Sequence, residues 1–163
     1  MSDFASTEQR LAVTCRRYPG FPRRPGVLVR LIKHIHKLLH DEANLLLKPY
    51  GVNHPEYNLL MMLYGTASGT MSPSELADAA GEKSANITRL TNELSEKGLI
   101  ARNASADDRR KVELSLTSQG QQLIESFLPD ICKLLVRQGR HLTVSEQIQL
   151  EKLLKKFLGG LAD

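Results

Sequence analysis

The side chains best suited to chemistry in this sequence lie at residues 83–92, in a stretch with helical periodicity. Ile87, Leu90 and Leu94 recur at spacings of three and four and mark the inward face of a predicted helix. The other positions carry amide, hydroxyl, guanidinium and small side chains, which are the groups that reach phosphates and base edges in DNA. The outward set comprises Lys83, Ser84, Ala85, Asn86, Thr88, Arg89 and Asn92.

A second charged group lies between two strand-like segments, residues 99–102 and 112–116. Their alternation predicts a short hairpin with the sequence Asp-Asp-Arg-Arg-Lys near its tip. An arginine at such a tip suits a narrow minor groove with enhanced negative potential, and a neighbouring aspartate can orient its guanidinium. The predicted DNA contacts of the hairpin are Asp108, Arg109, Arg110 and Lys111.

The element before this helix is a shorter capped helix. Ser72 and Glu75 form a capping box around Pro73, and the helix stops at Gly81. Ser84 is expected to cap the next helix, which ends at Lys97 and Gly98. Small residues where two helices cross favour a helix-turn-helix, and we include two hydroxyls of the first helix, Ser72 and Ser74, among the predicted DNA contacts.

Long amphipathic helices flank this segment. They are predicted from about residue 27 to 48, from 53 to about 64, from 117 onward and from 143 onward, after a short helix around residues 8–13. Pro129 is expected to kink or break the third of these long helices. The expected organisation is an N-terminal extension at 1–26, helical dimerisation regions at 27–66 and 118–163, and a winged helix-turn-helix at 67–117.

Composition narrows the class of protein. The 163 residues have a net charge of +4 and normal apolar and charged fractions. Residues 72–117 carry seven Lys or Arg against eight acids, so any positive charge there acts by position rather than by bulk. No apolar run approaches the roughly 20 residues that span a bilayer, and no signal peptide follows Met1, so we expect a cytoplasmic protein.

The stretch from about Ser72 to Gly120 resembles the MarR family of winged-helix transcription regulators. The resemblance rests on Asp108-x-Arg110 in the wing and on the Leu114-x-Leu116-Thr117-x-x-Gly120 pattern after it, and the helix order extends it over about residues 27–160. It implies a mainly α fold with a small β-hairpin wing and a homodimer on one pseudo-palindromic double-stranded DNA site. It also implies that Ser84, Asn86, Thr88 and Arg89 read the major groove, while Arg110 with Asp108 serves the wing.

Within the family, the long extension and the FPRRPG sequence before the first long helix look most like repressors of multidrug efflux pumps. That likeness implies release from DNA by a phenolic or lipophilic compound such as salicylate. Apolar walls with a few convergent polar groups suit such an effector, and we expect its pocket where the dimerisation helices meet the helix-turn-helix. The candidate lining residues are His36, His40, Tyr57, Met61, Tyr64 and Arg89.

Alternatives remain open. Cys15 beside Arg16 and Arg17 suggests a redox-sensing repressor, because nearby cations favour a thiolate. His36 and His40 stand one helical turn apart, but no further ligand has a persuasive spacing, so we predict no metal site and no cofactor. An architectural DNA-binding protein is another alternative, but it would carry a broadly basic surface, and the nearly neutral segment 72–117 argues against it. No nucleophile, carboxylate pair or phosphate loop supports an enzyme.

Overall fold

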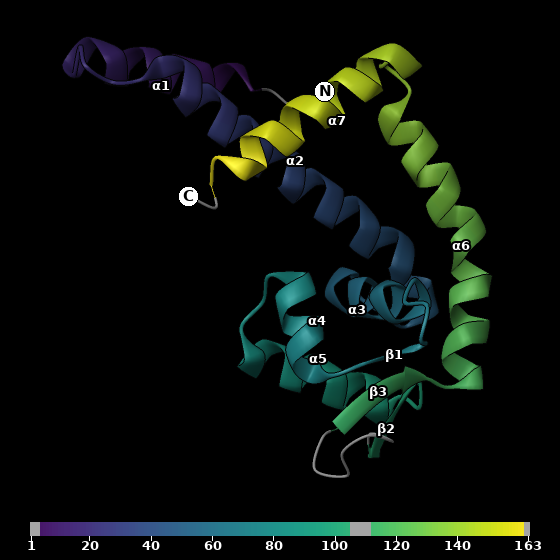
Figure 1. Ribbon diagram of the computed structural model, residues 1–163. Helices are drawn as coiled ribbons and strands as arrows, with labels where there is room; N and C mark the ends of the chain where they lie inside the picture. The colour runs from purple at the N-terminus through teal and green to yellow at the C-terminus, as the bar shows by residue number, and fades with distance from the viewer. Residues whose placement is uncertain (1–3, 105–111, 162–163) are drawn as a thin grey trace. The chain divides into compact units, whose positions relative to one another are not determined.

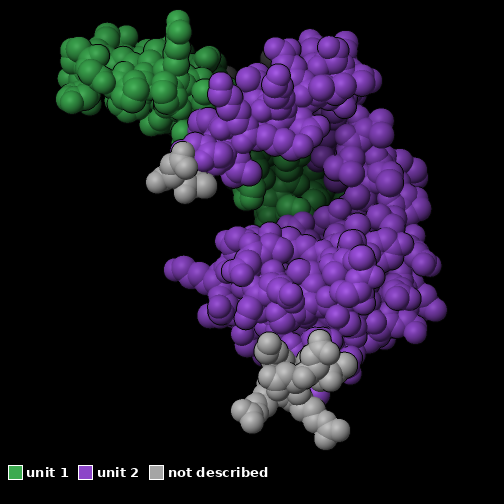
Figure 2. Space-filling model, in the orientation of Figure 1, with its two compact units in different colours: residues 1–54 green, residues 55–163 purple. Residues whose placement is uncertain are grey.

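The computed structural model describes residues 4–104 and 112–161, and its chain divides into two compact units, residues 1–54 and 55–163 (Figure 2). This division differs from the functional grouping expected above, which stays a prediction. Each unit is described by itself. Among the described residues, no helix is both long and apolar enough to cross a membrane.

The first unit consists of two helices and a short turn. Helix α1 (Ala5–Arg17) lies along α2 (Arg23–Leu47) and buries Leu11, and the 3-10 turn η1 (Lys48–Tyr50) follows (Figure 1). The predicted helix around residues 8–13 is therefore confirmed and longer than expected. Helix α2 begins four residues before the predicted start, because Pro25 lies in its first turn, where a missing N–H needs no partner.

Helix α3 (His54–Tyr64) starts as predicted; its first residue belongs to the first unit, and the second unit begins at Pro55. The α3 residues Leu59, Leu60 and Leu63 are buried, whereas Tyr64 is 44% exposed. Glu56 is also buried, and its carboxylate accepts a 2.6 Å hydrogen bond from Lys97 Nζ at the end of α5. The ring of Tyr57 meets Phe127 of α6 edge-on at 5.6 Å. These two contacts attach α3 to the rest of its unit.

The winged helix-turn-helix consists of α4 (Pro73–Ala80), α5 (Ser84–Glu96) and a three-stranded sheet. Strands β2 (Ile100–Ala104) and β3 (Val112–Leu116) form the predicted hairpin, with Ile100 opposite Leu116. A third strand that the sequence did not predict, β1 (Thr70–Met71), pairs antiparallel with the other edge of β3. The order β1-β3-β2 places β3 at the centre.

Two further helices complete the unit. Helix α6 (Ser118–Gly139) begins at Thr117, whose hydroxyl accepts from Gly120 N and donates to Gly98 O, and α7 (Val144–Gly159) follows a turn at the end of α6 remote from the sheet (Figure 1). Pro129 does not break α6, which runs through it as one helix of 22 residues. The sequence predicted a kink or a break at this position because proline removes one hydrogen bond. Of the two, the break does not occur, and the buried residues Phe127 and Ile131 on either side stabilise the helix.

Candidate nucleic-acid interface

The start of α4 is set by its cap. Ser72 Oγ accepts from Glu75 N at 3.2 Å, and Glu75 Oε2 accepts from Ser72 N at 2.7 Å, so the predicted capping box is confirmed. Gly81 ends α4 with a φ of +63°, a conformation that glycine adopts without strain. The hydroxyl of Ser72 is thus occupied by the helix end, whereas Ser74 is exposed.

Helix α5 separates its residues into two faces as predicted. Ile87, Leu90 and Leu94 are at most 1% exposed and pack inward, and Thr91 is buried beside them. Of the outward set, Asn86 is half-buried and the remaining members are exposed: Lys83, Ser84, Ala85, Thr88, Arg89 and Asn92. The predicted cap is wrong by one residue, because Lys83 is the N-cap and the Ser84 side chain does not cap the helix.

Hydrogen bonds organise the polar face of α5. Arg89 Nη1 donates to Glu93 Oε1 at 2.6 Å, and Arg89 Nη2 donates to Asn86 Oδ1 at 3.0 Å. The Asn86 amide in turn donates to Glu82 Oε2 at 2.8 Å. The Arg89 side chain is 58% exposed, and an exposed ion pair contributes only about 0–1 kcal/mol, so phosphate or guanine can replace Glu93 at low cost. The network orients Arg89 without locking it.

One residue of this face was missed by sequence reasoning. Arg102, on β2, donates to Thr91 Oγ1 at 2.9 Å and also to Asn92 Oδ1, and so joins the hairpin to the outward edge of α5. Its guanidinium fixes the orientation of the Asn92 amide. Arg102 approaches the helix because β2 contacts α5, and the spacing of residues in the sequence does not predict that contact.

The predicted wing residues Asp108, Arg109, Arg110 and Lys111 lie outside the described residues. What the structure describes is the base of the hairpin, where Asn103 Nδ2 donates to Ser115 Oγ at 3.3 Å. The wing contacts therefore remain predictions.

The six predicted effector residues fall into separate groups. His36 and His40 stack on α2 with ring centroids 6.3 Å apart, and His40 Nδ1 lies 3.0 Å from Nδ1 of His54, which the sequence did not suggest. Tyr57, Met61 and Tyr64 follow one another at spacings of four and three, so they share a face of α3. Arg89 lies on α5 beside Glu93. Of the cavities in the described part of the chain, one between α1 and α2 and one on α6 are lined by none of these six residues.

Burial shifts two of the titratable groups. Desolvation lowers the pKa of His54, and the neighbouring His40 and His36 lower it further. Burial raises the pKa of Tyr57. Both cysteines are free thiols; Cys15 is half-buried in α1 and Cys132 is exposed on α6. The described residues contain no group of three His, Cys, Asp or Glu side chains placed to hold a metal ion.

Comparison with known proteins matches this arrangement. The model of the MarR family matches residues 52–112. The transcriptional repressor MprA of Escherichia coli (strain K12) is 33% identical over 160 residues, which cover 98% of this chain and 91% of MprA. The HTH-type transcriptional regulator PrsX of Escherichia coli is 33% identical over 145 residues, covering 89% of this chain and 87% of PrsX.

Solved structures show the same fold. A crystal structure of a cysteine-to-serine mutant of MarR from Escherichia coli, complexed with operator DNA, superposes with a TM-score of 0.75 at 26% identity and covers 80% of this chain and 93% of that one. A MarR/EmrR family transcriptional regulator from Acinetobacter sp. ADP1 gives a TM-score of 0.76 at 22% identity, with 83% and 94% covered.

Proposed function

Because the chain belongs to the MarR family of DNA-binding transcriptional regulators, we propose that it is a homodimeric repressor released from its operator by a small phenolic or lipophilic compound. It is a regulator rather than an enzyme. The observation that supports the proposal is the outward face of α5, where a hydrogen bond joins Asn86 and Arg89, the two side chains proposed to contact base edges. We further propose that it acts in the cytoplasm.

The DNA contacts follow from this face. Arg89 presents a guanidinium suited to bidentate contact with guanine, and Asn86 presents an amide suited to adenine. Thr88 is exposed and donates its hydroxyl hydrogen to Ser84 O at 2.9 Å, so its hydroxyl oxygen can still accept a hydrogen bond. Lys83 and the wing residues Arg109, Arg110 and Lys111 serve the phosphate backbone or minor groove, with Asp108 orienting Arg110.

The proposed homodimer explains apolar residues that a single chain leaves in water. On α2, Leu28, Ile32, Ile35 and Leu39 are between 37% and 50% exposed, and they recur at spacings of four, three and four along one face. On α7, Ile148, Leu153, Leu154 and Leu158 are between 46% and 67% exposed. Continuous apolar surfaces of this kind mark interaction sites, and two copies of the chain would bury both.

The proposed effector and target rest on the resemblance to efflux-pump repressors. MprA is itself named a transcriptional repressor, and its match extends into the N-terminal extension of this chain. The proposed effector residues are His36, His40, Tyr57, Met61, Tyr64 and Arg89. A redox switch through Cys15 is the second candidate, favoured by the presence of that free thiol in α1.

The test is binding of the purified protein to DNA from upstream of its own gene, measured by fluorescence anisotropy with and without salicylate. Tight, selective binding that salicylate relieves supports the proposal. Binding that ignores salicylate but is abolished by peroxide, and preserved in Cys15→Ser, would establish the redox switch instead. An absence of selective binding would contradict the repressor altogether.

A further inference from the structure

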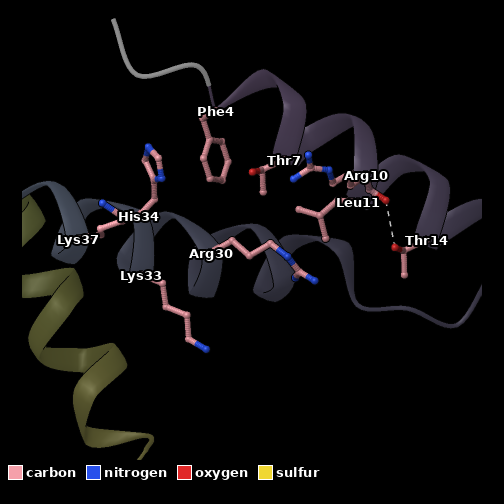
Figure 3. Close-up of a pocket in the computed structure, with 9 residues that line it drawn as sticks. All are labelled: Phe4, Thr7, Arg10, Leu11, Thr14, Arg30, Lys33, His34 and Lys37. Atoms are coloured by element: carbon pink, nitrogen blue, oxygen red, sulfur yellow. Dashed lines mark hydrogen bonds between the residues drawn. The ribbon is translucent and has the colours of Figure 1, made fainter.

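A cavity lies between α1 and the N-terminal half of α2, inside the first unit (Figure 3). Its volume is about 430 Å³, within the range of roughly 300–1,000 Å³ that is typical of small-molecule sites. Phe4 and Leu11 supply an apolar lining, and both side chains extend from the α1 side toward α2 in Figure 3. Leu11 is 1% exposed.

The rest of the lining is strongly basic. Arg30, Lys33, His34 and Lys37 follow one another on α2 at spacings of three, one and three, which places them on one face of the helix. Arg10 adds a guanidinium from α1. Of the described residues that line the cavity, four are Arg or Lys and none is acidic.

This row of cations destabilises α2. Like charges three or four residues apart destabilise a helix, and Arg30, Lys33 and Lys37 form two such pairs. Lys37 has Asp41 as its ion-pair partner, and Arg30 donates to Gly26 O at 3.2 Å and lies over the Phe21 ring. Within the described part of the chain, Arg10 and Lys33 have no carboxylate within ion-pair distance. Among the described residues, the lining therefore carries more positive than negative charge.

We propose that this cavity binds a small amphipathic organic anion, a carboxylate or sulfonate carried on a flat apolar body. The anionic group would lie between Arg10 and the cations of α2, where charge-assisted hydrogen bonds are strongest. The body would lie on Phe4 and Leu11. The Phe4 ring already meets the His34 ring at 6.0 Å, with an interplanar angle of 56°, so the lining offers an aromatic surface as well.

This site is separate from the effector residues proposed above and does not depend on DNA release. At 100° of rotation per residue, the basic residues of α2 lie between roughly 100° and 160° around the helix from Ile32 and Ile35. A second copy that covers the apolar face of α2 would therefore leave the basic face of the same helix uncovered.

The test is direct calorimetric titration of the full chain, without DNA, with 1-naphthoate, 1-naphthalenesulfonate and the neutral 1-naphthamide. The variant Arg10→Gln/Lys33→Gln removes two lining cations. Its matched control, Arg16→Gln/Arg24→Gln, removes two exposed cations of the same unit that do not line the cavity. Circular dichroism checks that both variants fold.

One molecule of an anionic probe should bind each chain, at least about tenfold more tightly than the amide. The Arg10→Gln/Lys33→Gln variant should lose most of that preference and the control should keep it. The two anionic probes identify which head group the cavity prefers. Equal affinity for naphthoate, sulfonate and amide would overturn the site, as would unchanged anion binding by the lining variant. If the wild type shows no preference for the anionic probes and the lining variant binds DNA more weakly, these cations would be assigned to DNA binding instead.

Discussion

Arg89 and Arg102 hold the polar face of α5 through different partners, and the difference defines their roles. Arg89 is held by Glu93 and Asn86, both on its own helix, and can exchange either for DNA. Arg102 extends from β2, and its guanidinium donates hydrogen bonds to Thr91 and Asn92 of α5. Arg89 is therefore suited to touch DNA, and Arg102 is suited to position Asn92, a proposed DNA contact.

Lys97 should matter to stability more than its exposure suggests. Its ammonium is the ion-pair partner of Glu56, whose side chain is 1% exposed, so Lys97→Met leaves a buried carboxylate without that partner. We expect a loss of about 1–3 kcal/mol in the free energy of unfolding, measured by urea denaturation. The control Lys133→Met breaks an exposed pair with Asp130 and should change stability by less than about 1 kcal/mol. Equal losses in the two variants would refute the role of burial.

His54 should make stability depend on pH. Its pKa is lowered in the folded chain from 6.5, so the unfolded chain binds the proton more readily once the pH falls below that value. Unfolding then takes up protons, and the folded state loses stability as the solution becomes more acidic. In thermal melts between about pH 8 and pH 5, the wild type should lose more stability than His54→Gln, which has no imidazole to titrate. Parallel losses would show that His54 is not the group responsible.

At the scale of elements, the start of α6 requires a residue without a Cβ atom at position 120. A Cβ on Gly120 would lie 2.1 Å from the carbonyl oxygen of Leu99, so backbone atoms would have to move. Gly120→Ala should destabilise the fold by at least about 2 kcal/mol. Gly159→Ala is the matched control, because a Cβ there has nothing within 4 Å and alanine favours helix. Thermal unfolding checks both, and a Gly120→Ala variant as stable as the wild type would contradict the close approach.

The sequence predicted the elements whose signals are local. Residues a few positions apart predict the Ser72 cap, the start of α7 near Thr143, the inward face of α5 and the β2–β3 hairpin. Strand β1 has two residues and no periodicity, and its partner Ser115 is far along the chain from Thr70, so local pattern could not reveal it. The contacts of Arg102 with α5 and of His54 with His40 were missed for the same reason.

At the scale of the whole molecule, the proposed dimer depends on the apolar face of α2. Ile35 is 50% exposed in the single chain, and Ile35→Glu would place a charge in the proposed interface. Sedimentation equilibrium at micromolar concentration should show a dimer for the wild type and a monomer for this variant. Lys33→Glu introduces the same residue on the opposite face of α2 and should stay dimeric. A monomeric wild type, or an undiminished dimer in Ile35→Glu, would refute this interface.

The central claim is that the outward face of α5 selects a DNA sequence. The most direct test compares affinity for DNA from upstream of the gene with affinity for a shuffled duplex of the same composition. The wild type and the exposed-cation control Arg17→Ala should prefer the upstream DNA, whereas Asn86→Ala/Arg89→Ala should lose at least about tenfold of that preference, since each bidentate base contact contributes about 1–3 kcal/mol. A variant that retains the full preference of the wild type would contradict the account.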